Sequence, residues 1–181
     1  MSKVAVHLTL ASVKHADPGE RPFVWNVTQH PDYIRGPKVY GPTLASPYTI
    51  PPEIRKQPAL TPPQNEITIS YRGLPWAINI VAPVGEVVTV ELTLTEIYKS
   101  LHVTVHEHEL DNLYQAYPGL KEKAGKAFRA RIASLPANKR EEERRRGFKR
   151  VDLLADNVQF AGLSPEAEED SLSIHFAPFT S

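Results

Sequence analysis

The chain has 181 residues, no cysteine, and 21 Lys and Arg residues that balance 21 Asp and Glu residues. The lack of cysteine excludes disulfide scaffolds, cysteine-ligated zinc and thiol nucleophiles, and the neutral charge provides no global attraction to nucleic acid or anionic membranes. We expect one domain over residues 1–181, large enough to bury a core without metals or disulfides. Because no apolar run approaches the length of a membrane span, we expect a cytoplasmic protein.

The N-terminal third is dominated by proline. Residues 4–10 are apolar but short and are interrupted by His7, which favours a first strand over a signal peptide. Residues 16–63 hold eleven of the 17 prolines, which exclude helices and central strands there. Apolar and aromatic residues recur between these prolines, unlike in a disordered linker. We expect an extended arm folded over a sheet, with one short strand at residues 23–27 and a candidate strand at residues 48–50.

A β-hairpin is predicted at the centre of the chain. Apolar and polar residues alternate over residues 67–72 and again over residues 76–81, the period of half-buried strands. Gly73 allows the tight turn between them. Residues 87–90 are β-branched throughout and predict a third strand.

The apolar spacing changes after Glu91 to that of a helix. One apolar stripe is formed by Leu94, Ile97, Tyr98 and Leu101. Thr93 and Glu96 predict a capping box at the start of this helix.

A second, short helix is predicted around residues 110–114. Two starts compete for it, Thr104 with Glu107 and His106 with Glu109. Threonine is the better N-cap of the two.

The remaining elements follow in order. A longer helix is predicted from Leu120 to Leu135, ending at Pro136. Residues 137–147 are expected to form a charged surface loop. Strands are expected at residues 148–154, 158–161 and 172–177, with turns at residues 156–157 and 162–165. The fold class is therefore α+β: a single domain with a mixed or antiparallel sheet of about five to seven strands, about three helices packed on one face, and a Pro-rich extended N-terminal arm.

Several segments keep a characteristic order across the C-terminal two thirds of the chain: LPWAI at residues 74–78, VTV at 88–90, the helical stripe at 94–101, GFKRVDLL at 147–154 and FAGLS at 160–164. In order and spacing they resemble a domain family of unknown function that is abundant in mushroom-forming fungi, and residues 25–27 and 45–47 resemble it more faintly. The family tends to place an aspartate just before the first helix, where this chain has Leu92-Thr93. The resemblance implies a compact α+β domain in a basidiomycete and no assigned chemistry.

His102, His106 and His108 form the densest histidine cluster. In an extended segment the three imidazoles would share one face and could bind a divalent metal beside a carboxylate. If a helix begins at Glu107, His106 and His108 diverge, and exposed histidines at the start of a helix are the favoured interpretation. A histidine beside a carboxylate is also sufficient for cofactor-free acid–base chemistry, so His102, His106 and Glu109 are candidate catalytic residues.

Ligand-binding candidates are charged or aromatic. Arg150 and Asp152 would face the same way on a strand and could bind a carboxylate or phosphate, although an ion pair that holds the strand is favoured. Aromatic residues beside Pro-rich backbone can line a groove or fill a core, and here they are Trp25, Tyr48 and Trp76. The basic stretch at residues 139–150 lacks interleaved aromatic residues, so we expect a solvated loop there and no nucleic-acid site.

Common catalytic signatures such as GxGxxG, GxxxxGK[ST], HExxH and GxSxG are absent from the chain. We therefore predict a ligand- or protein-binding module without catalysis and without a cofactor. Its partner would be a small molecule or a protein, with no nucleic acid and no membrane, and the chain would be a monomer or a homodimer. The alternative is a small cofactor-free or metal-dependent enzyme of lyase, isomerase or hydrolase type, which acts on a small metabolite through His102, His106 or His108.

Overall fold

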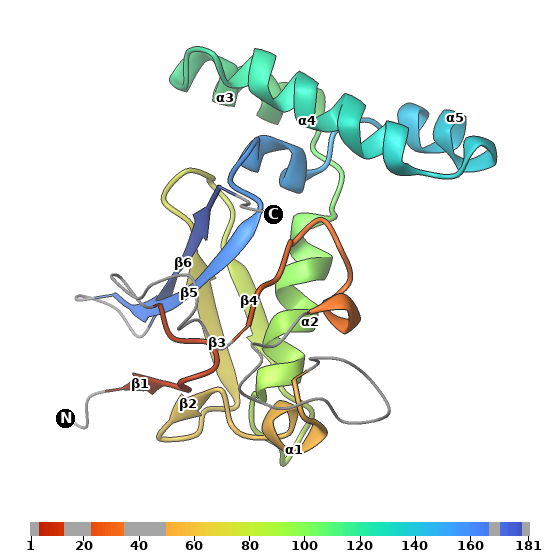
Figure 1. Ribbon diagram of the computed structural model, residues 1–181. Helices are drawn as coiled ribbons and strands as arrows, with labels where there is room; N and C mark the ends of the chain where they lie inside the picture. Colours follow the sequence, from red (N-terminus) through yellow and green to blue (C-terminus); the bar gives the residue numbers. More distant parts are fainter. Residues whose placement is uncertain (1–3, 13–22, 35–49, 167–170, 179–181) are drawn as a thin grey trace.

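The fold is built on a four-stranded sheet. The computed structural model describes residues 4–12, 23–34, 50–166 and 171–178. The sheet has the order β4-β3-β6-β5, and its strands are β3 (Glu66–Ser70), β4 (Ile78–Val81), β5 (Gln159–Pro165) and β6 (Ser171–Ala177). β3 pairs antiparallel with β4 and parallel with β6, and β5 pairs antiparallel with β6. The mixed sheet and its helices confirm the predicted α+β class (Figure 1).

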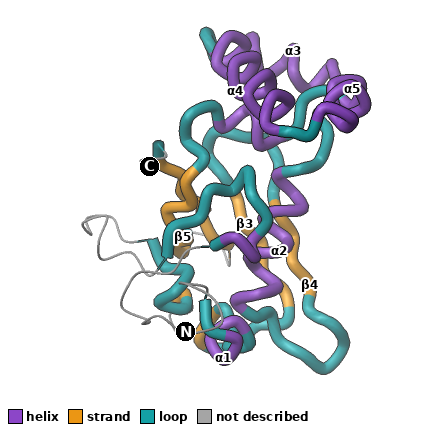
Figure 2. The backbone as a smooth tube through the Cα atoms, turned by 45° about the vertical axis from the view of Figure 1, so that its right-hand side comes forward, coloured by secondary structure: helices purple, strands orange, loops and turns teal. Residues whose placement is uncertain are grey.

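The helical layer is split into two parts. α2 (Val90–Leu101) lies along the sheet, and its apolar stripe packs into the same core as the inward-facing isoleucines of β3 and β4 (Figure 1). α3 (Glu107–Ala116), α4 (Leu120–Ser134) and α5 (Ala137–Arg146) form a separate layer beyond one end of the sheet (Figures 1 and 2). The 3-10 helix η4 (Arg150–Leu154) lies between this layer and the sheet. Within the described residues, no helix has both the length and the apolar character that crossing a membrane requires.

The N-terminal segments contain little regular secondary structure. β1 (Ala5–Val6) pairs antiparallel with β2 (Leu60–Thr61), so the strand expected over residues 4–10 is only two residues long. The 3-10 helix η2 (Pro31–Tyr33) and the single turn α1 (Pro52–Arg55) both begin at proline, which is tolerated in the first turn because its missing N–H would have no partner there.

Residues 23–27 of the Pro-rich arm pack along the outer edge of β5. Phe23, Trp25 and Val27 are buried. Phe160 N–H donates to the Trp25 carbonyl at 2.9 Å, and Val27 N–H donates to the Val158 carbonyl at 2.9 Å. The strand expected at residues 23–27 is thus reduced to isolated β-bridges at Val24 and Asn26, the second of them with Gln159. The candidate strand at residues 48–50 lies mostly outside the described residues.

Two predictions around the start of α2 are wrong. Residues 87–89 do not form a strand; they run extended into the helix, and Thr89 makes one isolated bridge with Pro58. Thr89 is the N-cap of α2, because its side-chain oxygen accepts from Leu92 N–H at 3.2 Å. Thr93, the predicted cap, lies inside the helix and donates to the Thr89 carbonyl at 2.8 Å. Thr89 fits the N-cap position because its own backbone is extended.

α3 begins at the second of the two predicted starts. His106 is the N-cap, and its N–H donates to Glu109 Oε2 at 2.9 Å. Thr104 forms a β-bridge with Lys149 instead. The longer helix predicted after it is confirmed as α4.

Two predictions beyond α4 are also wrong. The expected charged loop at residues 137–147 is the helix α5, whose basic and acidic side chains pair at helical spacing. The expected strand at residues 148–154 contains η4 instead, because the Asp152 carboxylate accepts from Lys149 N–H at 2.9 Å and closes a tight turn.

The last two strands form a hairpin that was only partly predicted. The expected strand at residues 158–161 and turn at residues 162–165 merge into β5, which continues through an irregularity between Phe160 and Gly162. The closing strand at residues 172–177 is confirmed as β6.

Candidate functional site

A partly open apolar pocket lies where the β3–β4 hairpin, β6, the end of α2 and η4 meet, and we call it the Trp76–Arg150 pocket. Its cavity volume is only about 20 Å³ and it opens to solvent, so it is a shallow hollow, far smaller than the sites that enclose drug-sized ligands. Its wall is mostly aliphatic and aromatic, with one hydroxyl and one guanidinium: Ile69, Tyr71, Leu74, Trp76, Ile78, Ser100, Leu101, Arg150, Ile174 and Phe176.

The local sequence explains the apolar wall. Ile69 lies opposite Ile78 on β4 and Leu172 on β6, so the alternation of three strands brings their inward side chains to one face. The hairpin turn then folds Tyr71 back, and its ring meets the ring of Phe176 edge-on with centroids 5.1 Å apart. A Cβ on Gly73 would lie 2.8 Å from the Tyr71 ring, so a larger residue there would displace this ring from its present position.

Arg150 is the charged group of the pocket. Its guanidinium carbon lies 4.6 Å from the centroid of the Trp76 ring, within the range of a cation–π contact. Nη1 donates to Ser100 Oγ at 3.1 Å. Burial lowers the pKa of Arg150, while the charge of Glu109 acts in the opposite direction; the group stays charged at neutral pH. Among the described residues, no carboxylate forms an ion pair with Arg150.

Glu109 holds Trp76 in this position. Trp76 Nε1–H donates to Glu109 Oε1 at 2.8 Å, while Glu109 Oε2 accepts from His106 N–H. These two hydrogen bonds, the backbone one first, lower the pKa of Glu109. The carboxylate is therefore ionised at neutral pH, and the start of α3 is tied through Trp76 to Arg150.

Of the five ligand-binding candidates, the structure brings Trp76 and Arg150 together. Trp25 is 1% exposed and lies in the main core, where its Nε1–H donates to the Gln29 carbonyl at 2.9 Å. Tyr48 lies outside the described residues. Asp152 is on η4 like Arg150, but it does not line the pocket.

Asp152 belongs to a separate charged cluster between α4, α5 and η4. It is 2% exposed, and its two oxygens accept from Arg131 Nε at 2.8 Å and Nη2 at 2.7 Å. Glu143 pairs with Arg131 at 2.7 Å and also with Lys149. The expected Arg150–Asp152 arrangement is thus corrected, because a 3-10 turn does not place alternate residues on one side. The sequence held one indication of the role of Arg131, because a basic residue on the side of a predicted helix that faces the core needs an acidic partner.

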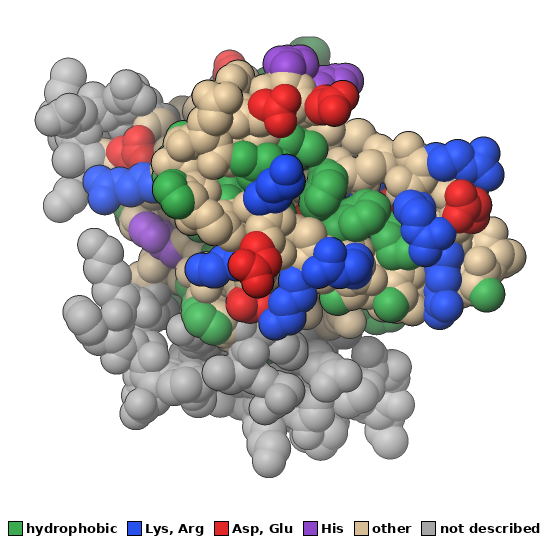
Figure 3. Space-filling model, turned by 90° about the horizontal axis from the view of Figure 1, so that it is seen from above, with side chains coloured by type: hydrophobic (Ala, Val, Ile, Leu, Met, Phe, Trp, Pro, Cys, Tyr) green, Lys and Arg blue, Asp and Glu red, His purple; other side chains and the backbone are tan. Residues whose placement is uncertain are grey.

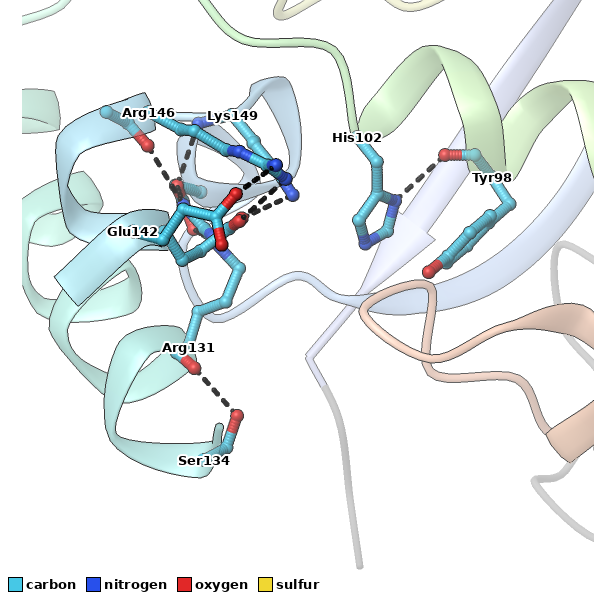
Figure 4. Close-up of polar contacts among 10 residues, drawn as sticks. Tyr98, His102, Arg131, Ser134, Glu142, Arg146 and Lys149 are labelled. Atoms are coloured by element: carbon cyan, nitrogen blue, oxygen red, sulfur yellow. Dashed lines mark hydrogen bonds and ion pairs between the residues drawn. The ribbon is translucent and has the colours of Figure 1, made fainter. Parts of the chain in front are cut away.

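The three candidate histidines do not form a common site. His102 follows α2; its Nδ1–H donates to the Tyr98 carbonyl at 2.8 Å, and its ring packs on Tyr98 (Figure 4). His106 and His108 stack on each other with centroids 5.9 Å apart, which corrects the expectation that a helix from Glu107 would separate them. Within the described part of the chain, no group of three or more His, Asp or Glu side chains could hold a metal ion.

The face formed by the α3–α5 layer is mixed in character. Hydrophobic side chains gather in the middle of this face, histidine and acidic side chains lie along one margin, and basic side chains lie toward the α5 end (Figure 3). The candidate catalytic histidine His106 is exposed here and does not line the pocket.

A serine–histidine contact that the sequence patterns did not predict joins β5 and β6. Ser164 Oγ lies 2.7 Å from His175 Nε2. Both residues face away from the core, since their neighbours Leu163 and Ile174 are buried. The contact is a cross-strand pair of the kind that stabilises a hairpin.

No curated protein and no solved structure matches the chain. Residues 23–171 match a family of unknown function (DUF6699). The match spans Trp76, Glu109 and Arg150 and ends before the pocket residues Ile174 and Phe176. Because it covers most of the chain, the protein belongs to this family of unknown function, DUF6699.

Proposed function

We propose that the protein is a binding module without catalysis, and that its Trp76–Arg150 pocket takes a ligand that joins a carboxylate to an apolar body. One observation carries this proposal: the Arg150 guanidinium is fixed beside an apolar pocket and has no carboxylate partner among the described residues. Small-ligand sites commonly combine an apolar wall with a few placed polar groups.

The geometry of Arg150 supports binding of a carboxylate. Its stacking on Trp76 and its hydrogen bond to Ser100 hold the side chain in one orientation, so little conformational entropy is lost when a ligand binds. The guanidinium has five N–H donors, of which one is used by Ser100, and the others suit a bidentate contact. Partial burial excludes water and strengthens such a contact.

Glu109 offsets part of the cost of burying the Arg150 charge. A buried cation without any nearby anion is costly, and the Glu109 charge counteracts part of the lowering of the Arg150 pKa by burial. Because both Glu109 oxygens already accept hydrogen bonds, they do not need to pair with the guanidinium.

The placement of the histidines supports binding over catalysis. A metal-dependent enzyme needs a set of converging ligands, and His102, His106 and His108 are held in two separate surroundings. A cofactor-free enzyme needs a general base at the substrate, and none of these histidines lines the pocket with Arg150.

The test compares two probes of nearly equal shape, 3-phenylpropanoate and its neutral amide, 3-phenylpropanamide. Binding is followed by the fluorescence of Trp76 in a Trp25→Phe protein, because the chain has only these 2 tryptophans. We expect saturable binding of the carboxylate, and at least about tenfold weaker binding of the amide or in Arg150→Gln, since a hydrogen bond to a charged group contributes about 1.5–3 kcal/mol.

The matched control is Arg144→Gln, which removes an exposed arginine of α5 that pairs with Glu141. Its affinity for 3-phenylpropanoate should equal that of the parent protein. Equal binding of the two probes, or unchanged binding by Arg150→Gln, would contradict the proposal, and so would the absence of any binding of the carboxylate.

A further inference from the structure

The outer edge of β4 carries backbone groups that have no backbone partner among the described residues. β4 is the terminal strand of the sheet. Ala82 N–H donates to the Asn65 carbonyl at 2.8 Å, so Ile78 and Ile80, which alternate with it, also turn their backbone groups toward β3. The backbone groups of Asn79 and Val81 therefore point outward, and within the described part of the chain they find no backbone partner. Figure 2 shows β4 at the margin of the molecule.

The two edges of the sheet differ in how far the described residues cover them. On the β5 side, Ala11 bridges Leu163 and Asn26 bridges Gln159, so N-terminal segments cover that edge. On the β4 side the strand reads INIV, without proline or charge, and natural proteins usually protect an exposed edge with one of these devices. Val81 is 64% exposed and Val84 is fully exposed. An uncharged edge that no described residue covers, with exposed valines at its end, is suited to pairing with another strand.

The same edge leads to the Trp76–Arg150 pocket. Ile78, the first residue of β4, lines the pocket, and Trp76 lies two residues before it. Arg150 stacks on Trp76 and so lies at the start of β4. A peptide that ends at Arg150 would therefore run antiparallel to β4, away from Val81 and toward Trp76.

We propose that the ligand is the C-terminal end of an extended peptide of another protein, which adds to β4 as an antiparallel strand and places its terminal carboxylate on Arg150. This inference rests on the proposed function. The charge complementarity lies between the terminal carboxylate and a guanidinium that has no carboxylate partner among the described residues. The last side chain of the peptide would pack on the apolar wall of the pocket, and the peptide backbone would form hydrogen bonds with the backbones of Asn79 and Val81. In such recognition the main chain provides affinity and the pocket provides specificity.

The probes for this inference are acetylated hexapeptides that alternate threonine and valine and end in phenylalanine, leucine or isoleucine. Each is prepared as the free acid and as the C-terminal amide. We expect at least one free acid to bind more tightly than 3-phenylpropanoate, and its amide to bind at least about tenfold more weakly, since the amide loses the charge-assisted contact with Arg150.

Val81→Pro tests the edge itself. The Val81 N–H points away from β3, so proline there removes an outward donor without breaking a bond inside the sheet. Val81→Thr is the matched control, because it keeps the N–H and the β-branched shape. We expect Val81→Pro to weaken the peptide at least about tenfold, and both variants to bind 3-phenylpropanoate like the parent protein. Amide exchange of β3 verifies that the sheet is intact.

A second measurement leaves the protein unchanged. Two sets of peptides are N-methylated at alternate backbone positions, so that one set lacks the N–H donors that face β4 and the other lacks those that face solvent. Only the set without the donors that face β4 should lose affinity. If both sets bind alike and Val81→Pro has no effect while 3-phenylpropanoate still binds, strand addition is overturned and the pocket stands. If acid and amide peptides bind equally, the terminal carboxylate is overturned. If 3-phenylpropanoate does not bind either, the proposed function is contradicted as well.

Discussion

Gly162 shows how a single residue permits the packing of the N-terminal segment on the sheet. It lies at the irregularity in β5, with φ of +107°, a backbone conformation that favours glycine. Ser12 N–H donates to the Leu163 carbonyl, and Leu163 N–H donates to the Leu10 carbonyl, each at 2.7 Å. A Cβ on Gly162 would lie 2.5 Å from Ser12 Cα, where only backbone could move to make room.

We expect Gly162→Ala to lower the free energy of unfolding more than Gly85→Ala does. Gly85 has φ of +83° and nothing within 4 Å of the added Cβ, so alanine there should cost only about 1–2 kcal/mol of backbone strain. Gly162→Ala adds a backbone clash to a similar strain and should cost at least about 2 kcal/mol more, in the range of large single-site effects. Equilibrium unfolding in urea measures both variants. Equal losses would show that the N-terminal segment does not press on β5.

α5 is an element held by charge pairs and very little by burial. None of its residues is buried. Arg144 pairs with Glu141 at 2.7 Å and Arg146 with Glu142 at 2.6 Å, at helical spacing. Each exposed pair contributes only about 0.2–0.5 kcal/mol. The partly buried contact of Glu143 with Arg131 and Lys149 links α5 to α4 and to the residue before η4. Arg140 also donates to the Ala133 and Leu135 carbonyls at the end of α4.

We expect Glu142→Pro to abolish the hydrogen-exchange protection of α5 amides, while Glu142→Ala leaves most of it. Proline removes an interior helix bond and costs about 3 kcal/mol or more. Alanine loses one exposed ion pair, worth a few tenths of a kcal/mol, and this small loss should shrink further at high salt. Similar exchange in the two variants would mean that residues 137–146 behave as the loop that their composition suggests.

At the scale of the whole molecule, two apolar clusters of unequal size meet at η4. The main cluster includes the inward faces of β3, β4, β5 and β6 with α2 and the arm. Among the described residues, the second cluster has four buried residues: Val105, Leu113, Ala124 and Leu153. η4 belongs to both, because Val151 and Leu154 pack in the main cluster and Leu153 in the second.

We expect native-state hydrogen exchange to show a partial opening in which α3 and α4 exchange at lower free energy than α2 and β3. Regions with few buried apolar contacts open at lower cost. Leu153→Ala should lower the opening free energy of α3 and α4 by about 2–5 kcal/mol, with less effect on α2. Leu94→Ala, in the main cluster, should lower the opening free energy of every element. A common opening free energy for all the helices in the parent protein would contradict this division.

What the sequence by itself determined is local. The two-residue alternation of Ile67 and Ile69, and of Leu172 and Ile174, predicted β3 and β6, and the helical stripe ending at Leu101 predicted most of α2. Such patterns are reliable because each depends on neighbouring residues that face one core. Trp76 and Arg150 were also named from the sequence as ligand-binding candidates, although for separate reasons.

Only the tertiary structure decided how distant groups meet. Residues 148–154 alternate as a strand would, yet Asp152 turns inward to Arg131, a residue 21 positions earlier, and forms η4. That turn is what brings Arg150 onto Trp76 and makes the pocket. The covering of one sheet edge and the exposure of the other likewise depend on where the N-terminal segments pack. These contacts cannot be predicted from a local sequence pattern, because the energy of a buried charge depends on a partner that is far away in the chain.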